Sequence, residues 1–140
     1  MFISKLAFWI NHFRRNMNKV IKFSNNIKQL REYWSPRILA EANDQYIKIA
    51  KVKGEFVWHK HNNEEEFFFL LKGSLTIEMQ EGTVILHEGD GFVVPKNTLH
   101  RPIAKKECWI MLIEPKSTKH TGEEITPLTR DISDQITNSE

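Results

Sequence analysis

Cysteine and tyrosine are scarce in this chain of 140 residues, which has only Cys108, Tyr33 and Tyr46. A single cysteine excludes an intramolecular disulfide, which favours a reducing compartment, so we expect a cytoplasmic protein. Long apolar runs are also missing: the apolar and aromatic run over residues 2–10 is too short to cross a bilayer. These absences exclude a disulfide-stapled domain and predict no transmembrane segment.

The chain also lacks a strong charge of either sign, because its formal net charge is only +2. The basic residues are unevenly distributed: residues 1–22 carry five of them and no acid. The remainder, 23–140, has 15 basic and 18 acidic residues and is mildly acidic. This balance shows no basic footprint for nucleic acid, so we expect no nucleic-acid partner.

The composition divides the chain into three parts. Residues 1–22 form a basic and apolar extension, expected to lie outside the domain; Met17 could be the natural start, and a helix lying on a membrane surface is the alternative. Residues 23–116 are predicted to form one β-barrel. Residues 117–140 are a polar tail with sparse apolar residues, expected to be loosely ordered or to pack on a partner subunit.

Short strands separated by turn residues dominate the middle of the chain. Ser24 can cap a helix over 25–33, which Pro36 prevents from continuing. After it, apolar and polar residues alternate, most clearly at Leu75, Ile77 and Met79. About eight to ten strands argue for an all-β sandwich or barrel. The predicted strands cover 37–42, 45–52, 55–61, 66–71, 75–79, 83–86, 92–94, 99–103 and 108–113.

Three histidines and a glutamate form the main candidate site. Because alternate side chains of a strand point the same way, His59 and His61 can meet one metal ion. Glu66 lies in the returning strand roughly opposite them, and Glu65 is the alternative ligand. His100 comes from a later strand and completes the set. Imidazole and carboxylate ligands suit divalent transition metals.

These residues stand in a frame that resembles the two cupin motifs. In the first motif the histidines and the glutamate lie between two glycines, and the gap from Gly54 to His59 is one residue shorter than usual. The second motif ends at His100. Asn97 replaces a usual glycine, which is mild because asparagine tolerates left-handed backbone, and Ala104 replaces a usual asparagine. The motif residues are Gly54, His59, His61, Glu66 and Gly73, then Gly89, Pro95 and His100.

The chain, over residues 36–115, is therefore identified as a small single-domain cupin, similar to those grouped as mannose-6-phosphate isomerase-like. The resemblance implies an all-β cupin double-stranded β-helix, a jelly-roll barrel, here with a short N-terminal helical segment. It also implies a homodimer. The ligand set implied is His59, His61, Glu66 and His100, for a divalent transition metal: Fe, Mn, Ni, Zn, Co or Cu.

Four protein ligands in an octahedral shell leave two positions open for a small polar organic molecule such as a sugar or keto acid. A metal-dependent dioxygenase, isomerase or lyase fits this arrangement. The alternative is a non-catalytic module that binds a small ligand or the metal, and fold alone does not decide between them. No helix-turn-helix pattern precedes the barrel, which argues against a transcription factor.

The remaining side chains receive weaker expectations. We expect Val57, Phe68 and Leu70 to form an apolar wall inside the barrel. We expect an apolar outer face from Trp58, Phe67, Phe69 and Leu71, which packs on the second sheet's flank or on a dimer partner. Glu55 is either an acid or base beside the metal or a solvated strand end. We expect core or interface positions for Trp109 and Met111, surface positions for His87 and His120, and a buried strand position for Cys108. Arg101 points away from the site but could reach an anionic ligand at the barrel mouth.

Overall fold

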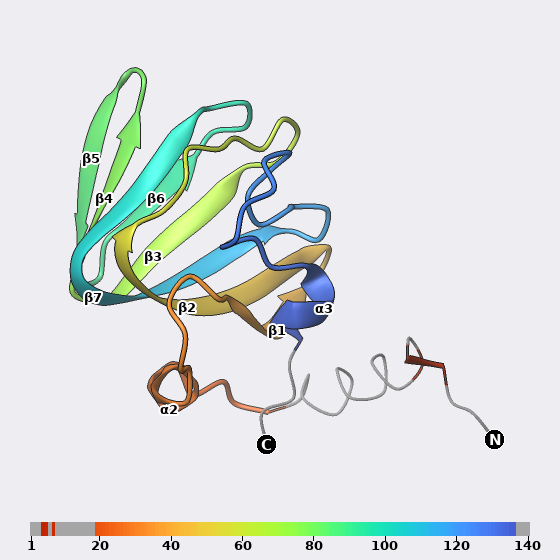
Figure 1. Ribbon diagram of the computed structural model, residues 1–140. Helices are drawn as coiled ribbons and strands as arrows, with labels where there is room; N and C mark the ends of the chain where they lie inside the picture. Colours follow the sequence, from red (N-terminus) through yellow and green to blue (C-terminus); the bar gives the residue numbers. More distant parts are fainter. Residues whose placement is uncertain (1–3, 6, 8–18, 137–140) are drawn as a thin grey trace.

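The computed structural model describes residues 4, 5, 7 and 19–136 (Figure 1). Most of the N-terminal extension, His12 and Met17 included, lies outside these residues. Helices α2 (Phe23–Lys28) and α3 (Ile132–Gln135) flank a barrel of seven strands in the described part of the chain. The strands are β1 (Arg37–Ala42), β2 (Gln45–Glu55), β3 (Glu66–Lys72), β4 (Ser74–Met79), β5 (Gly82–His87), β6 (Gly91–Val94) and β7 (His100–Pro115).

Strand β7 organises the barrel, because it pairs antiparallel with β2, β3 and β4. Its first residues pair with β4, which forms a hairpin with β5, while its later residues lie between β2 and β3. The order β1-β2-β7-β3-β6 completes the sheet. The fold is therefore the all-β cupin barrel that the sequence predicts. No helix among the described residues has the length and apolar character to cross a membrane.

The predicted bounds of the helix were wrong, and so were those of three predicted strands. The helix begins at Phe23, one residue before the predicted Ser24 cap, and ends at Lys28. The strands predicted at 99–103 and 108–113 are one continuous β7, whose polar residues 105–107 bulge where the register with β2 shifts. The strand predicted at 55–61 is absent, because β2 continues past its predicted end at residue 52 and ends at Glu55, just after Gly54 takes a positive φ of 84°.

The core lies inside the barrel, where alternate residues of each strand point inward. Phe68 and Leu70 are buried there, as predicted, and Val57 packs against the same cluster. Cys108 is also fully buried, as predicted. Burial raises the pKa of its thiol to about 12, so Cys108 is inert as a nucleophile.

Helix α2 covers part of the barrel's outer face. Ile27 of α2 is fully buried and packs with Ile49 of β2, and the half-buried Leu71 and Trp109 lie against the same cluster. This cover comes from the same chain. Among the described residues, no helix packs on the rest of the outer face, around Phe67 and the exposed Val93.

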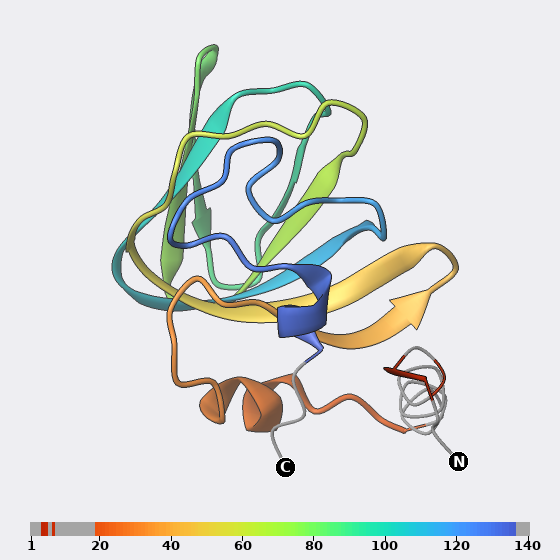
Figure 2. The ribbon, with the colours of Figure 1, turned by 45° about the vertical axis from the view of Figure 1, so that its right-hand side comes forward.

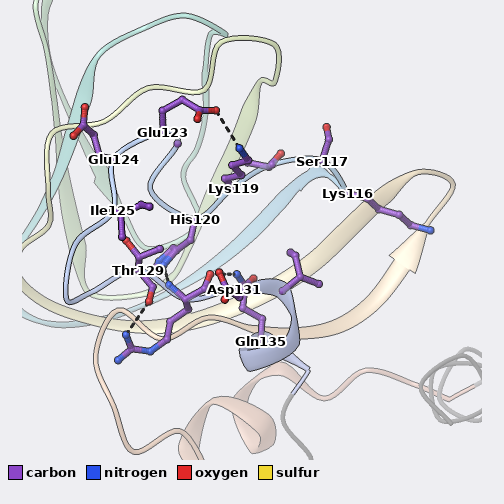
Figure 3. Close-up of a pocket in the computed structure, with 14 residues that line it drawn as sticks. Lys116, Ser117, Lys119, His120, Glu123, Glu124, Ile125, Thr129, Asp131 and Gln135 are labelled. Atoms are coloured by element: carbon purple, nitrogen blue, oxygen red, sulfur yellow. Dashed lines mark hydrogen bonds and ion pairs between the residues drawn. The ribbon is translucent and has the colours of Figure 1, made fainter. Parts of the chain in front are cut away.

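The segment after β7, residues 116–135, folds back across one end of the barrel (Figures 2 and 3). Thr118, Thr121 and Gln135 of this segment are at least 99% buried. Gly122 lies so close to Lys60 that an added Cβ would be 2.1 Å from its carbonyl oxygen. The expectation of a loosely ordered or partner-bound tail is therefore wrong for this part, which packs on its own barrel.

Candidate metal centre

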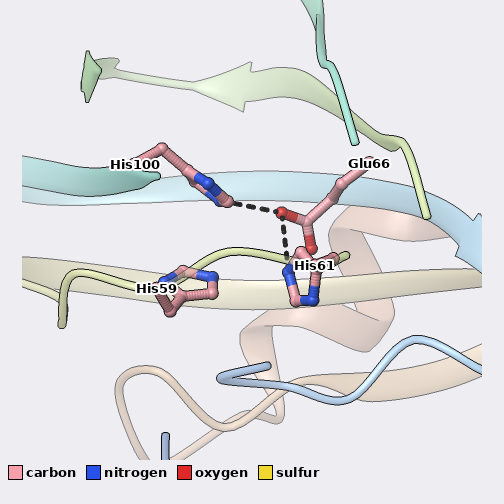
Figure 4. A group of neighbouring side chains, drawn as sticks. All are labelled: His59, His61, Glu66 and His100. Atoms are coloured by element: carbon pink, nitrogen blue, oxygen red, sulfur yellow. Dashed lines mark ion pairs between the residues drawn. The ribbon is translucent and has the colours of Figure 1, made fainter. Parts of the chain in front are cut away.

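Backbone pairing brings the four candidate ligands together. His59 lies between β2 and β3, and its backbone forms two hydrogen bonds with that of His100, with N–O distances of 3.1 and 2.9 Å. The Asn97 N–H donates to the His61 carbonyl at 2.7 Å. Asn97 adopts φ 57°, the left-handed conformation expected of the residue replacing glycine. Glu66 opens β3, and one ligand atom from each of the four residues lies within 4.8 Å of the others (Figure 4).

Two of the imidazole rings are held by backbone carbonyls. His59 Nδ1 is 2.9 Å from the Val57 carbonyl oxygen, and His100 Nδ1 is 2.8 Å from that of Thr98. A carbonyl only accepts hydrogen bonds, so Nδ1 carries the proton and Nε2 keeps its lone pair. This arrangement, common around metal-ligating histidines, leaves Nε2 available for a cation.

Several buried atoms of the group have no hydrogen-bond partner among the described residues. They are both ring nitrogens of His61, Oε1 of Glu66 and Nε2 of His100. The nearest contacts are longer than hydrogen bonds or at their limit, with Glu66 Oε1 3.5 Å from His100 Nε2 and 3.8 Å from His61 Nε2. Unpartnered buried polar atoms are costly. A cation bound among these lone pairs would satisfy them, so the group could hold a metal ion.

The choice between the two neighbouring glutamates follows from burial. Glu66 is 5% exposed and faces the histidines, whereas Glu65 is exposed to solvent. The structure therefore brings together the ligand set that the sequence favours and leaves the alternative glutamate outside.

The site keeps its ligands in their metal-binding protonation states. Burial, and then the neighbouring His100, lower the pKa of His59 to about 4. Burial also lowers the pKa of His61. Burial by itself would raise the pKa of Glu66, but the neighbouring imidazoles of His100 and His61 hold that pKa well below its usual range. At neutral pH these two imidazoles are neutral and the carboxyl is ionised, as metal ligation requires.

A buried ion pair lies beside Glu66 inside the barrel. Lys48 Nζ is 2.6 Å from Glu114 Oε1, and the two side chains are 1% and 3% exposed. Burial and the charge of Glu66 raise the pKa of Glu114 to about 8, against the opposing effect of Lys48. Sequence reasoning missed this pair, because Lys48 stands between the apolar Ile47 and Ile49 and reads as the solvent-facing residue of its strand.

His120 was predicted to lie on the surface, and this prediction was wrong. Its ring centroid is 5.1 Å from that of Phe56, whose own ring lies 5.3 Å from that of His59. Burial lowers the pKa of His120 to about 3, so its ring is neutral. The Arg130 N–H donates to His120 Nδ1 at 2.9 Å, which places the ring proton on Nε2.

The other polar candidates lie away from the centre. Glu55 is the solvated strand-end residue: its side chain is 65% exposed and pairs with Arg101 at 3.3 Å. Arg101 also bonds Glu78 at 2.9 Å and covers the Trp58 ring, so its charge is engaged at the barrel's edge. His87 is exposed, as predicted. Glu55 therefore supplies no acid or base beside the ligands.

An antiparallel barrel with three histidines and a glutamate gathered inside it defines a cupin. Comparison with known proteins agrees, because the Cupin domain family matches residues 46–114. The chain belongs to this cupin family.

Three relatives illustrate the similarity. A cupin-2 domain containing protein from Shewanella frigidimarina has 43% sequence identity and a TM-score of 0.68, over 69% of this chain and 95% of that one. YdbB of Bacillus subtilis is 31% identical over 86 residues, 61% of this chain and 74% of that protein. The 3-hydroxyanthranilate 3,4-dioxygenase 2 of Aspergillus fumigatus is 28% identical over 80 residues, 53% of this chain but only 42% of the dioxygenase.

Proposed function

We propose that the protein is a metal-dependent cupin that acts on a small polar organic molecule. In this proposal His59, His61, Glu66 and His100 hold one divalent transition metal, which could be Fe, Mn, Ni, Zn, Co or Cu. One observation carries it: four ligand atoms converge in a buried site where most of them have no other partner. An unfilled cluster of this kind would be costly to bury.

The chain's own residues prepare this site for chemistry. The carbonyls of Val57 and Thr98 fix two of the rings, and the buried side chains of Phe56 and Phe68 limit the access of water. A bound divalent metal supplies Lewis-acid polarisation of an oxygen on the organic molecule. Sugars and keto acids present such oxygens, and these are the substrate classes that we propose.

Two observations bear on whether the protein is catalytic. The similarity to 3-hydroxyanthranilate 3,4-dioxygenase 2 supports dioxygenase chemistry, ahead of isomerase or lyase chemistry, although the match spans less than half of that protein. The exposure of Glu55 removes one candidate acid or base, which favours the alternative of a non-catalytic binding module.

The ligand assignment is tested by metal content. We expect His59→Ala and His100→Ala to lose bound metal while circular dichroism shows an intact barrel. The matched control is His87→Ala, which removes an exposed histidine and should keep the wild-type metal content. Stoichiometric metal in both ligand variants by elemental analysis would overturn the assignment.

Catalysis is tested by oxygen consumption. Protein loaded anaerobically with Fe(II) is mixed with 3-hydroxyanthranilate or with a 2-keto acid, and dioxygen uptake is recorded. Uptake that depends on the organic compound and disappears in His100→Ala supports the dioxygenase. Binding of the compound without its conversion supports the non-catalytic module instead.

We also propose a homodimer and a cytoplasmic location. The uncovered part of the outer face carries an apolar row across four strands, Ile47, Ile113, Phe67 and Val93, which pair side by side in the sheet. Val93 is 46% exposed, and a second copy of the chain would cover it. The free thiol of Cys108 accords with a reducing compartment.

A further inference from the structure

The C-terminal segment lines a partly open cavity of its own next to the metal centre. The cavity has a volume of about 340 Å³, within the range of small-molecule sites, and residues 116–135 of the segment supply its lining. Figure 3 shows these side chains around the hollow, with His120 among them. The metal ligands do not line it.

Two side chains that line this cavity are fully buried and have an unpartnered polar atom. Thr118 Oγ1 and Gln135 Oε1 have no hydrogen-bond partner among the described residues, and each residue is only 1% exposed. The amide nitrogen of Gln135 donates to the Arg130 carbonyl at 2.9 Å, which fixes Oε1 as the free acceptor. Native proteins rarely bury such atoms without a partner, so both indicate a bound polar group.

His120 adds a donor to the same lining. Its Nδ1 is occupied by the Arg130 N–H, so its Nε2–H is the remaining polar group of the ring. The residues that line the cavity thus carry an acceptor at Gln135, a donor at His120, and a hydroxyl at Thr118 that can do either, and charged side chains such as Lys119 and Glu123 lie beside them. No phenylalanine, tyrosine or tryptophan lines it.

The cavity is also connected to the metal centre. His120 lies against Phe56, which contacts His59, and Gly122 lies directly on the carbonyl of Lys60 between two ligands. A second cavity of about 240 Å³ reaches His61. The two cavities share part of their walls, formed by Ser117, Lys119, Gly122 and Glu123.

We propose that this C-terminal compartment binds a small aliphatic molecule with several hydroxyl groups, a sugar or sugar acid, beside the metal centre. A hydroxyl both donates and accepts, so adjacent hydroxyls can satisfy Gln135 Oε1, Thr118 Oγ1 and His120 Nε2 together. A planar aromatic compound would leave these atoms unpartnered and find no aromatic wall to stack on. The inference rests on the proposed function in one respect: the molecule held in this compartment would be the one presented to the neighbouring metal centre.

Calorimetric titration of the full chain tests the compartment, with D-glucuronate and D-mannose as probes and catechol as the aromatic comparator. We expect a hydroxylated probe to bind and catechol not to bind. Thr118→Val should weaken that binding about tenfold, the effect of one lost hydrogen bond to a buried group. Because the hydroxyl has no hydrogen-bond partner among the described residues, the melting temperature without probe should not fall. Thr83→Val, on the exposed part of β5, is the matched control.

His120→Gln provides a second variant, because its amide oxygen can still accept from the Arg130 N–H while the ring donor is lost. It should also weaken probe binding. Failure of both hydroxylated probes to bind, binding of catechol alone, or unchanged affinity in both variants would overturn the inference.

Metal content, measured on the same samples, separates this inference from the proposed function. Bound metal with no probe binding contradicts the compartment and leaves the proposed function standing. Probe binding in protein that neither contains nor takes up metal contradicts the proposed function and leaves the compartment standing.

Discussion

At the scale of single residues, buried charge governs the barrel interior. Glu66 and Glu114 are close enough to shift each other's pKa, and Lys48 is the ammonium that compensates them in the absence of metal. Removing one member of a buried ion pair leaves a charge without compensation, which costs more than the pair contributes. Lys48 therefore matters for stability as well as for the electrostatics of the site.

We expect Lys48→Met to lower the free energy of unfolding by about 3 kcal/mol above pH 8, where Glu114 is ionised, because Glu114 then loses the one ion-pair partner that it has among the described residues. The double variant with Glu114→Gln should recover more than half of the loss, since the second change removes the uncompensated carboxyl. Urea denaturation of the metal-free proteins measures both. Equal stability of wild type and Lys48→Met would contradict this account of the pair.

The pH dependence of stability follows from the shifted groups. His59 and His120 have their pKa lowered from 6.5 to about 4 and about 3, so the unfolded chain binds protons first and stability is lost as the pH falls below 6.5. Glu114 has its pKa raised from 4.5 to about 8, so its contribution is lost as the pH rises toward 8. Metal-free protein should be most stable near pH 6.5.

Chemical denaturation at several pH values between 4.5 and 8.5 checks this profile. The variant Glu114→Gln is the control, since it should abolish the alkaline decline and keep the acidic one. A stability that rises continuously from pH 6.5 to 8 in the wild type would show that the Glu114 shift is wrong.

The sequence predicts the metal ligands whose positions follow from their spacing along a strand or across a turn. His59 and His61 are two residues apart, and Glu66 follows a turn, so their meeting could be anticipated from spacing. Lys48 and His120 could not be placed in this way. Lys48 is buried because both faces of β2 are covered, and His120 is half-buried because a polar segment folds back over the barrel.

At the scale of elements, the C-terminal segment, residues 116–135, lies across one end of the barrel. Gly122 of this segment has a φ of 60° and no room for a side chain beside Lys60, which stands between the ligands His59 and His61. The segment is also tied at Ser117, whose hydroxyl bonds Glu64, and at Arg130, which pairs with Glu32. These contacts hold it over the end of the barrel.

Gly122→Ala should release this segment, because the new Cβ would collide with the Lys60 backbone. Hydrogen exchange should become faster over residues 117–136 and remain slow in β3 and β7. The matched control is Gly89→Ala, which has a similar positive φ of 87° but open space around its Cβ, so it should cost only about 1–2 kcal/mol of backbone strain. Equal exchange rates in the segment of both variants would contradict the close packing.

Most strands were predictable because each has one buried face and alternates accordingly, as in β4. Two segments were predicted wrongly, and the backbone pairing between strands explains each of them. The polar residues 105–107 look like a turn, yet they are the exposed bulge of a strand that remains paired on both sides of it. The segment 56–61 looks like a strand, yet only His59 forms a bridge, to His100.

At the scale of the whole molecule, the barrel has one face covered by α2 and an adjoining apolar row that is partly exposed. We proposed above that this row forms the interface of a homodimer. A charge placed in it would be buried without a partner on association.

Val93→Lys should therefore shift the protein from dimer to monomer in sedimentation velocity, with no change in its circular dichroism. The control is Ile85→Lys, on the β4–β5 hairpin, where the residue is 59% exposed but lies outside the row. A wild type that is monomeric at high concentration would refute the dimer, and so would a Val93→Lys variant that remains dimeric.

The central claim is that the buried histidines and glutamate form a metal centre, and a calorimetric metal titration tests it most directly. Full-length protein, stripped with a chelator at neutral pH, is titrated with Mn(II), Fe(II) under anaerobic conditions, and Zn(II). The account predicts one equivalent bound by the wild type and by His87→Ala, and none by Glu66→Gln combined with His100→Ala. No saturable uptake of any of these metals by the wild type, or undiminished uptake by the double variant, would contradict it.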